Sequence, residues 1–531
     1  MLILHMLGFL SYFSFCVTQA PVYVSTKVGN IMGFQEHISL DGEQKMISKF
    51  FGIPFAEPTG GENRFNKPVQ KAPFKGTFDA RKEPAACYQQ SAQDTSLRRI
   101  FGVSEFSEDC LTLNIYIPHE VRANNLRPVM IWIHGGGFTQ GTALMNKPEG
   151  LALFGNVIVV TINYRLGMFG FLRDRNGVFP GNQGLWDQHL AIKWVHDHID
   201  SFFGYKDEIT IFGQSAGGAS VIFQALYSGN AGLFKRVIAE SGSAVAPWAI
   251  QKVTTYDEYF IDQGCSTTSM TFASCLQSKT PISIQSNITM FGPVIDGDFV
   301  VASPIDIIND NATNTARARD FFASLDIIVG ANDKDGAGLF FSYERALNHT
   351  NIDFNISKDE FRNTLVPFIM NQILFYKEKD TKDALEKALI FFYTDWKNPD
   401  NDAFIRNKVA DMTNDAAFFS PASQTVNAHA KLNVGKTFLY EFAVQAITHY
   451  ISLPSWMKGT NHGEEMRFVF GLPLLANVSV PVNSSIRYSL EPKQVARATM
   501  AMWSNFAKSG INGRMNNVEL RKRHPTRHLE N

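Results

Sequence analysis

The fold is decided by the stretch ITIFGQSAGGAS, residues 209–220. Its first four residues are β-branched or aromatic and predict a buried strand, and the run from Ala219 to Leu226 has the composition of a helix. Between them stands G-x-S-x-G, the pattern in which a sharp strand-to-helix turn exposes a serine hydroxyl. Gly213 and Gly217 leave room that a Cβ would fill, and the helix N-terminus favours negative charge beside Ser215. Ser215 is therefore the candidate nucleophile.

Three more apolar runs have the character of buried parallel strands: residues 129–133, 157–162 and 325–329. A segment with helical spacing, 187–199, lies between the second run and the stretch quoted above. Strands that alternate with helices predict an α/β fold with a large, mostly parallel sheet covered by helices on both faces. Sites in such folds form at the carboxyl ends of the strands.

A serine nucleophile needs a histidine base, and the base needs a carboxylate that orients it. His462 stands among small residues in GTNHGEE (459–465) and is the candidate base. The candidate acid is Asp335, in GANDKDG directly after a predicted strand. Asp333 lies in the same loop, and spacing alone does not choose between the two carboxylates.

A glycine cluster follows the strand at 129–133, in HGGGF (134–138). Backbone N–H groups of such a cluster can approach a substrate oxygen closely, and the N–H of Ala216 can join them. One oxyanion donor contributes ~3 kcal/mol of transition-state stabilisation. His134 is expected to be structural.

Composition excludes several classes of function. The chain has 531 residues, of which 45% are hydrophobic and 19% charged, and its formal net charge is -1. A disordered chain would be poorer in apolar residues, and no charge excess exists to drive binding to nucleic acid or to an anionic membrane surface. We expect no metal, cofactor or nucleic-acid partner.

The N-terminal residues 1–20 are apolar and end at a small residue, as in a cleaved signal peptide. An N-terminal membrane anchor is the alternative, although the run is short for a span. No later segment is apolar enough to cross a bilayer. We expect one hydrolase-like domain over 21–512 and a basic, disordered tail over 513–531.

Cysteines and glycosylation motifs agree with secretion. Removal of the signal peptide removes Cys16 from the five cysteines and leaves an even four, for which three pairings are possible. Those four are Cys87, Cys110, Cys265 and Cys275. Six asparagines stand in N-x-[ST] motifs: Asn287, Asn311, Asn348, Asn355, Asn477 and Asn483.

Over residues 22–511 the chain resembles the type-B carboxylesterase and cholinesterase group of α/β-hydrolases. The resemblance rests on FFGIPFAEP with a following RF, SEDCLTLNIYIP, HGGGF, NYRLGMFGFL, GNQGLWDQ, ITIFGQSAGGAS, FGPVIDGDF and NHGEEMRFVFGLP. It implies an α/β-hydrolase fold and a secreted serine esterase that acts on small carboxylic esters through an acyl-enzyme. A long-chain lipase and a non-catalytic, cholinesterase-like adhesion protein are the alternatives.

The resemblance also implies roles for single residues. The triad would be Ser215, Asp335 and His462; the oxyanion donors would be Gly136, Gly137 and Ala216. Ser241 would lie behind the triad acid, and Trp248 would line the acyl pocket. The implied disulfides are Cys87–Cys110 and Cys265–Cys275, and the implied ion pairs are Arg64–Glu108 and Arg165–Asp187.

The chain departs from the pattern of the resemblance at several points. Most members carry Glu where Asp335 stands, and Gln214 replaces the usual Glu beside the nucleophile. The tail after residue 512 lacks the aromatic residues usual in this group.

Two departures bear on choline esters. The loop Tyr88–Asp109 contains no Trp, the residue whose face best binds a quaternary ammonium. Thr289 falls where acetylcholinesterases tend to have a Phe that limits acyl size. The sequence therefore predicts a preference for neutral esters over choline esters.

Overall fold

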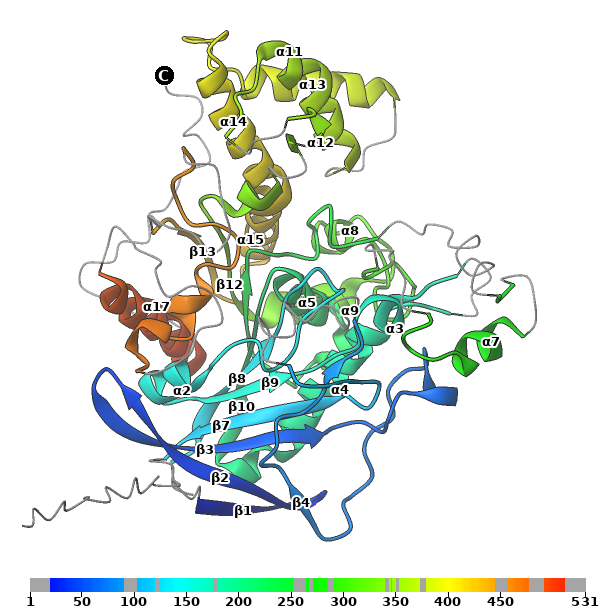
Figure 1. The fold of residues 1–531 in the computed structure, drawn as a ribbon, viewed down its shortest axis with the longest axis vertical. Coiled ribbons are helices and arrows are strands. Elements are labelled where there is room, and N and C mark those ends of the chain that lie inside the picture. Colours follow the sequence, from blue (N-terminus) through cyan, green and yellow to red (C-terminus); the bar gives the residue numbers. More distant parts are fainter. Residues whose placement is uncertain are drawn as a thin grey trace, which may run out of the picture.

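The computed structural model describes residues 20–89, 103–119, 125–174, 179–251, 264–266, 271–284, 291–339, 343–344, 346–349, 353–372, 379–444, 456–476 and 491–510. A single large sheet runs through it (Figure 1). In spatial order its strands are β1 (Ala20–Thr26), β2 (Gly29–Leu40), β3 (Glu43–Pro54), β7 (Thr112–Pro118), β9 (Ile158–Ile162), β8 (Arg127–Ile133), β10 (Gly204–Gln214), β11 (Arg236–Glu240), β12 (Asp326–Asn332) and β13 (Thr437–Phe442). A short strand, β4 (Thr77–Asp79), pairs with β2.

The strands from β9 to β13 are all parallel, whereas those from β1 to β9 are antiparallel. Four strands of the parallel part, β8, β9, β10 and β12, contain the apolar runs of the sequence, whereas β11 and β13 were not predicted. Because both faces of the sheet are covered, the central residues of these four strands are apolar and do not alternate with polar ones. The mostly parallel α/β sheet expected from the sequence is thus present.

Alternate residues of β8 enter two different hydrophobic cores. Val129, Ile131 and Ile133 pack in one core with helices α4 (Gln183–His198) and α5 (Ala216–Leu226). Met130 and Trp132 pack in the other, with α2 (Glu149–Gly155) and α17 (Pro492–Ser509). Helices therefore cover both faces of the sheet, as side chains of period two require.

A helical group lies beyond one end of the sheet, at the top of Figure 1. It has its own apolar core, to which α12 and α14 contribute buried side chains. Its elements are α11 (Lys358–Glu360), the π-helical turn η6 (Phe361–Leu365), α12 (Val366–Gln372), α13 (Lys379–Phe392), α14 (Asp402–Asn414) and the π-helical turn η7 (Asp415–Phe419). From η7 the chain continues into α15 (Ser420–Leu432), which packs on β12 and β13.

Shorter elements complete the described chain. They are β5 (Ala86–Cys87), β6 (Phe106–Ser107), α3 (Gly167–Phe171), α7 (Phe272–Ser278), α8 (Pro304–Ile308), α9 (Ala316–Ser324), α16 (Met466–Val469) and the 3-10 turns η1 (Gly61–Asn63), η3 (Ile199–Phe202), η4 (Ser228–Asn230), η5 (Asp335–Leu339) and η8 (Leu472–Leu474).

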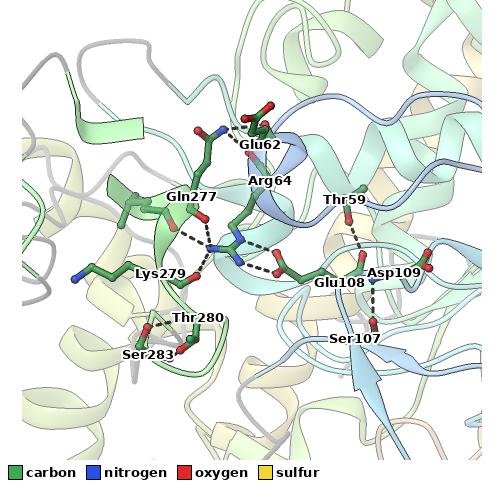
Figure 2. Close-up of polar contacts among 11 residues, drawn as sticks. Thr59, Glu62, Arg64, Ser107, Glu108, Asp109, Gln277, Lys279, Thr280 and Ser283 are labelled. Atoms are coloured by element: carbon green, nitrogen blue, oxygen red, sulfur yellow. Dashed lines mark hydrogen bonds and ion pairs between the residues drawn. The ribbon is translucent and has the colours of Figure 1, made fainter. Parts of the chain in front are cut away.

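Both implied disulfides are present, Cys87–Cys110 and Cys265–Cys275. Arg64 forms hydrogen bonds to both of the segments that contain these disulfides (Figure 2). Its Nε and Nη2 donate to the two carboxylate oxygens of Glu108 at 2.6 Å. Its Nη1 donates to the carbonyl of Leu276, at the end of α7, at 2.8 Å. The Arg64 guanidinium thus binds a carboxylate through two hydrogen bonds and also bonds to a carbonyl in the last turn of a helix. These bonds provide acceptors for its N–H groups although the side chain is almost fully buried.

The second implied ion pair joins Arg165, which follows β9, to Asp187 in α4. Two guanidinium nitrogens donate to the Asp187 carboxylate at 2.7 and 2.8 Å, and the Arg165 N–H donates to it at 3.0 Å. Both side chains are buried. Loss of one partner from such a pair typically costs about 3–5 kcal/mol, because the other charge stays buried alone.

Several sequence predictions fall outside the described residues. These are residues 1–19 of the expected signal peptide, Thr289, the motifs at Asn287, Asn477 and Asn483, and the tail at 513–531. The other three motif asparagines, Asn311, Asn348 and Asn355, are exposed. Among the described helices, none is both long and apolar enough to cross a bilayer.

Candidate active site

Ser215 stands in the sharp turn between β10 and α5, at φ 58° and ψ -124°. Its N–H donates to the carbonyl of Glu240 at 2.8 Å, which holds the turn against β11. The turn requires Gly217, because a Cβ there would lie 2.0 Å from the carbonyl oxygen of Ile133. This strained conformation is the one expected from G-x-S-x-G, and strain of this kind gathers at functional sites.

The structure brings His462 to Asp335. The His462 Nδ1 lies 2.8 Å from Asp335 Oδ1, and Asp335 Oδ2 accepts from the Asn332 N–H at 2.6 Å. An ionised carboxylate only accepts hydrogen bonds, so Nδ1 carries the proton and the lone pair lies on Nε2. The imidazole is thereby held in the tautomer that a general base needs. Asp333, the alternative acid, accepts instead from the Thr460 N–H at 2.7 Å.

Gln214 lies next to the basic nitrogen of His462. Its side-chain Nε2 is 3.2 Å from His462 Nε2. An amide N–H can donate to that lone pair, but unlike the carboxylate of a glutamate it brings no negative charge. The position beside the base is therefore neutral in this chain.

The glycine loop HGGGF packs directly against the serine turn. A Cβ on Gly135 would lie 3.0 Å from the Ser215 Cβ and 2.5 Å from the Gln214 carbonyl oxygen. Gly136 and Gly137 both have positive φ, at 104° and 63°. The candidate oxyanion donors of the loop are thus neighbours of the serine and of Ala216, the first residue of α5.

His134, in the same loop, is buried and packs on the ring of Tyr164 with the centroids 4.4 Å apart. Burial lowers the pKa of His134 to about 4, although its hydrogen bond to the Gly135 carbonyl opposes the shift. A neutral, packed imidazole supports the glycine loop, which is the structural role expected of it.

Two buried glutamates, Glu240 and Glu465, lie close to Ser241 and Asp335, and neither was assigned a role from the sequence. Ser241 is fully buried at φ 50°, next to Glu240. The Glu240 carboxylate accepts from the Trp503 indole N–H at 2.7 Å, and burial, then the charge of Glu465, raise the Glu240 pKa well above its ordinary value. Glu465 accepts from the Asn332 side-chain amide. Burial, followed by the charge of Asp335, raises the Glu465 pKa to about 7.

An aromatic pair extends from the base toward the helical group. Phe418, in the π-helical turn η7, lies with its ring centroid 4.8 Å from that of His462. Trp248 lies 6.0 Å from Phe418 and donates its indole N–H to the Ala417 carbonyl at 2.8 Å. The candidate acyl-pocket residue Trp248 therefore lies one ring away from the base. π-helical turns occur often at functional sites.

Phe418 was not predicted from the sequence, because no motif marks residues 415–419. Glu240 directly precedes Ser241, and Glu465 lies in the motif NHGEEMRFVFGLP, so proximity to motif residues was the available signal for both. The described residues hold no cluster of three or more His, Cys, Asp or Glu that could bind a metal ion. The arrangement suits acyl transfer, with a serine, an oriented imidazole and backbone donors within one loop cluster.

The pH dependence of ester hydrolysis should reveal the base. Burial lowers the His462 pKa, but the hydrogen bond and charge of Asp335, aided by the charge of Glu465, outweigh it and raise the pKa above 6.5. Only the neutral imidazole accepts a proton, so kcat/KM should fall as the pH decreases through a midpoint above 6.5. Because Glu465 titrates nearby, the midpoint belongs to the pair. A flat kcat/KM profile from pH 5 to 8 would contradict a histidine base.

Comparison with known proteins places these features in context. A family model described as "Carboxylesterase family" matches residues 20–527. Acetylcholinesterase 1 of Caenorhabditis briggsae and acetylcholinesterase of Bungarus fasciatus are each 33% identical to the chain, over 93% of it and 80% of their own length. Neuroligin-3 of Mus musculus is 31% identical, over 95% of the chain and 63% of its own length.

Proposed function

Since the chain belongs to the carboxylesterase family, we propose that it is a serine hydrolase that cleaves neutral carboxylic esters through an acyl-enzyme. The observation that carries this proposal is the 2.8 Å contact between His462 and Asp335 beside the strained turn of Ser215. The contact supports an imidazole with its lone pair on Nε2, and the turn of Ser215 has the conformation expected of a nucleophilic serine. The two disulfides of the chain support a secretory location.

The proposed reaction has two halves. In the first, Ser215 Oγ attacks the ester carbonyl, His462 Nε2 takes the hydroxyl proton, and the same imidazolium then protonates the leaving alcohol. In the second, His462 removes a proton from water, which attacks the acyl-enzyme carbonyl; the imidazolium then returns the proton to Ser215 Oγ as the C–O bond to the serine breaks and the acid leaves. In both tetrahedral intermediates the oxyanion would lie against the N–H groups of Gly136, Gly137 and Ala216.

A non-catalytic role is the alternative from another class of function, since one relative is named a neuroligin and not an esterase. Family membership alone therefore does not establish catalysis. The complete constellation of Ser215, His462 and Asp335 favours an enzyme, because an adhesion protein has no need of a strained serine or of an oriented base.

The proposal is tested with purified protein and p-nitrophenyl esters of increasing acyl length, with and without an organophosphate. We expect hydrolysis that the organophosphate abolishes, with kcat/KM highest for short acyl chains. A maximum at long acyl chains would favour the lipase alternative. Absence of turnover on every ester would favour the non-catalytic protein.

The neutral position at Gln214 leads to a prediction about choline esters. The Gln214 amide beside His462 Nε2 carries no charge that could attract a quaternary ammonium, and the loop Tyr88–Asp109 has no Trp to bind one. We therefore expect kcat/KM for acetylthiocholine to exceed that for the uncharged isostere 3,3-dimethylbutyl thioacetate by less than tenfold, or ~1.4 kcal/mol.

The matched variant for this prediction is Gln214→Glu, which adds the absent charge with little change in shape. It should raise the ratio of choline ester to isostere, because the cation gains an attraction that the neutral ester does not. If kcat/KM of the wild type for acetylthiocholine exceeds that for the isostere by well over tenfold, the predicted preference for neutral esters is wrong.

A further inference from the structure

Two loops form the base–acid half of the site, and they run side by side. The acid loop follows β12 and carries residues 333–335, while the base loop carries residues 459–462. Lys334 and Asn461 form an isolated parallel β-bridge, in which the Lys334 N–H donates to the Thr460 carbonyl at 3.1 Å. The distance between His462 and Asp335 therefore depends on the register of these two loops.

Asp333 supplies the side-chain contact at the start of this pairing. Its Oδ1 accepts from the Thr460 N–H at 2.7 Å, and its own N–H donates to the Phe442 carbonyl at the end of β13 at 3.0 Å. Asn332 makes the next contact, from its side-chain amide to the Asn461 carbonyl at 2.8 Å. Thr460 and Asn461 are both buried, so their backbone groups have little water to bond with instead.

The base loop is shaped to receive this carboxylate. Gly459 has φ 136°, and a Cβ there would lie 2.6 Å from Asp333 Oδ2. The absence of a side chain lets the carboxylate lie against the backbone at the point where the base loop begins. Both loops therefore contribute to the contact: Gly459 leaves space in the base loop, and Asp333 provides the acceptor oxygen from the acid loop.

We propose that Asp333 is a positioning residue, which holds the loop of His462 in register with the loop of Asp335. The inference rests on the proposed ester hydrolysis and on the contact of the Asp333 carboxylate with the backbone N–H of Thr460. A shift of about 1 Å in a reacting group can reduce the rate about 100-fold. Asp333, the alternative acid predicted from the sequence, therefore acts on His462 through the backbone of the base loop.

The charge state of Asp333 determines the pH at which the variants are compared. Burial raises the Asp333 pKa to about 6; the hydrogen bond from Thr460 and the charge of Lys334 oppose this shift, and the charge of Glu441 adds to it. At pH 8 the group is ionised and is only an acceptor. An asparagine keeps one acceptor oxygen at the same place without the charge.

The experiment measures kcat, KM and the acidic limb of the pH profile for Asp333→Ala and Asp333→Asn, with p-nitrophenyl acetate at pH 8. We expect Asp333→Ala to lower kcat about 10- to 100-fold with little change in KM. Its acidic limb should move to lower pH, because a weaker His462–Asp335 contact raises the His462 pKa less. Asp333→Asn should stay within about threefold of wild type, since its amide oxygen still accepts from the Thr460 N–H.

The matched control is Asp411→Ala, which removes the partner of Lys334 at 3.0 Å but no contact to the base loop, and its kcat should be unchanged. An unchanged kcat and pH profile in Asp333→Ala would overturn the proposal. So would an equal kcat loss in Asp333→Asn, because that result requires the charge and not the hydrogen bond.

If Asp333→Ala does not fold, Asp333→Glu replaces it, since the extra methylene displaces the acceptor oxygen while the charge remains. An unchanged kcat in that variant would overturn the proposal equally. Wild-type protein without any turnover would instead contradict the proposed ester hydrolysis, so the two failures are distinguishable.

Discussion

Ser215→Ala is expected to lower kcat for p-nitrophenyl acetate by about six orders of magnitude, the scale on which loss of a triad nucleophile acts. The alanine keeps the backbone N–H that bonds to the Glu240 carbonyl at 2.8 Å, so the turn between β10 and α5 should survive. The hydroxyl oxygen is the only atom removed, and no acyl-enzyme can form without it. Thermal unfolding should change little.

The matched control for this variant is Ser220→Ala, in the same helix. Ser220 accepts a hydrogen bond from the Gln188 side chain at 3.0 Å and lies one turn further along α5. Its loss should cost about 1 kcal/mol of stability and leave kcat within a few-fold of wild type. Near wild-type hydrolysis by Ser215→Ala would falsify the assignment of the nucleophile.

Asp335→Asn is expected to lower kcat by about four orders of magnitude. An amide at this position can donate to His462 Nδ1, which moves the imidazole proton to Nε2 and removes the base. The Asn332 N–H that now bonds to Asp335 Oδ2 at 2.6 Å still finds an acceptor if the amide oxygen faces it. The loop should therefore stay in place while the reaction stops.

The paired substitution is Asp333→Asn, for which only a mild loss is expected. Both carboxylates follow the same strand, β12, and both variants exchange one oxygen for an amide nitrogen. The ranking of the two kcat values therefore reports which of them orients the imidazole. The reverse ranking would move the acid of the triad to Asp333.

The parallel strands β8, β9, β10 and β12 were predictable because their central residues form continuous apolar runs, whereas β11 and β13 were not predicted. The runs at 129–133 and 209–212 became the cores of β8 and β10, since a parallel strand covered on both faces has no polar side. Helix α4 begins at Gln183, four residues before the predicted start at 187. Gly184 has a low helix propensity, which tertiary packing against Phe171 overrides.

The acid of the site could not be chosen from spacing alone. Asp333 and Asp335 are two residues apart, and the direction of each side chain depends on the turn after β12, which bonds one to Thr460 and the other to His462. The resemblance selected Asp335, and the geometry brings it to the base. No sequence pattern connects Glu240 to Trp503, because 263 residues separate them and only the packing of α17 brings them together.

The proposed acyl-enzyme is tested most directly by trapping its serine. The protein is incubated with a fluorophosphonate, digested, and mapped by mass spectrometry while residual esterase activity is followed. We expect one adduct per chain, on the peptide that contains Ser215, formed in proportion to the loss of activity and absent from Ser215→Ala. An adduct on a different residue, or full activity after complete labelling of Ser215, would contradict this account.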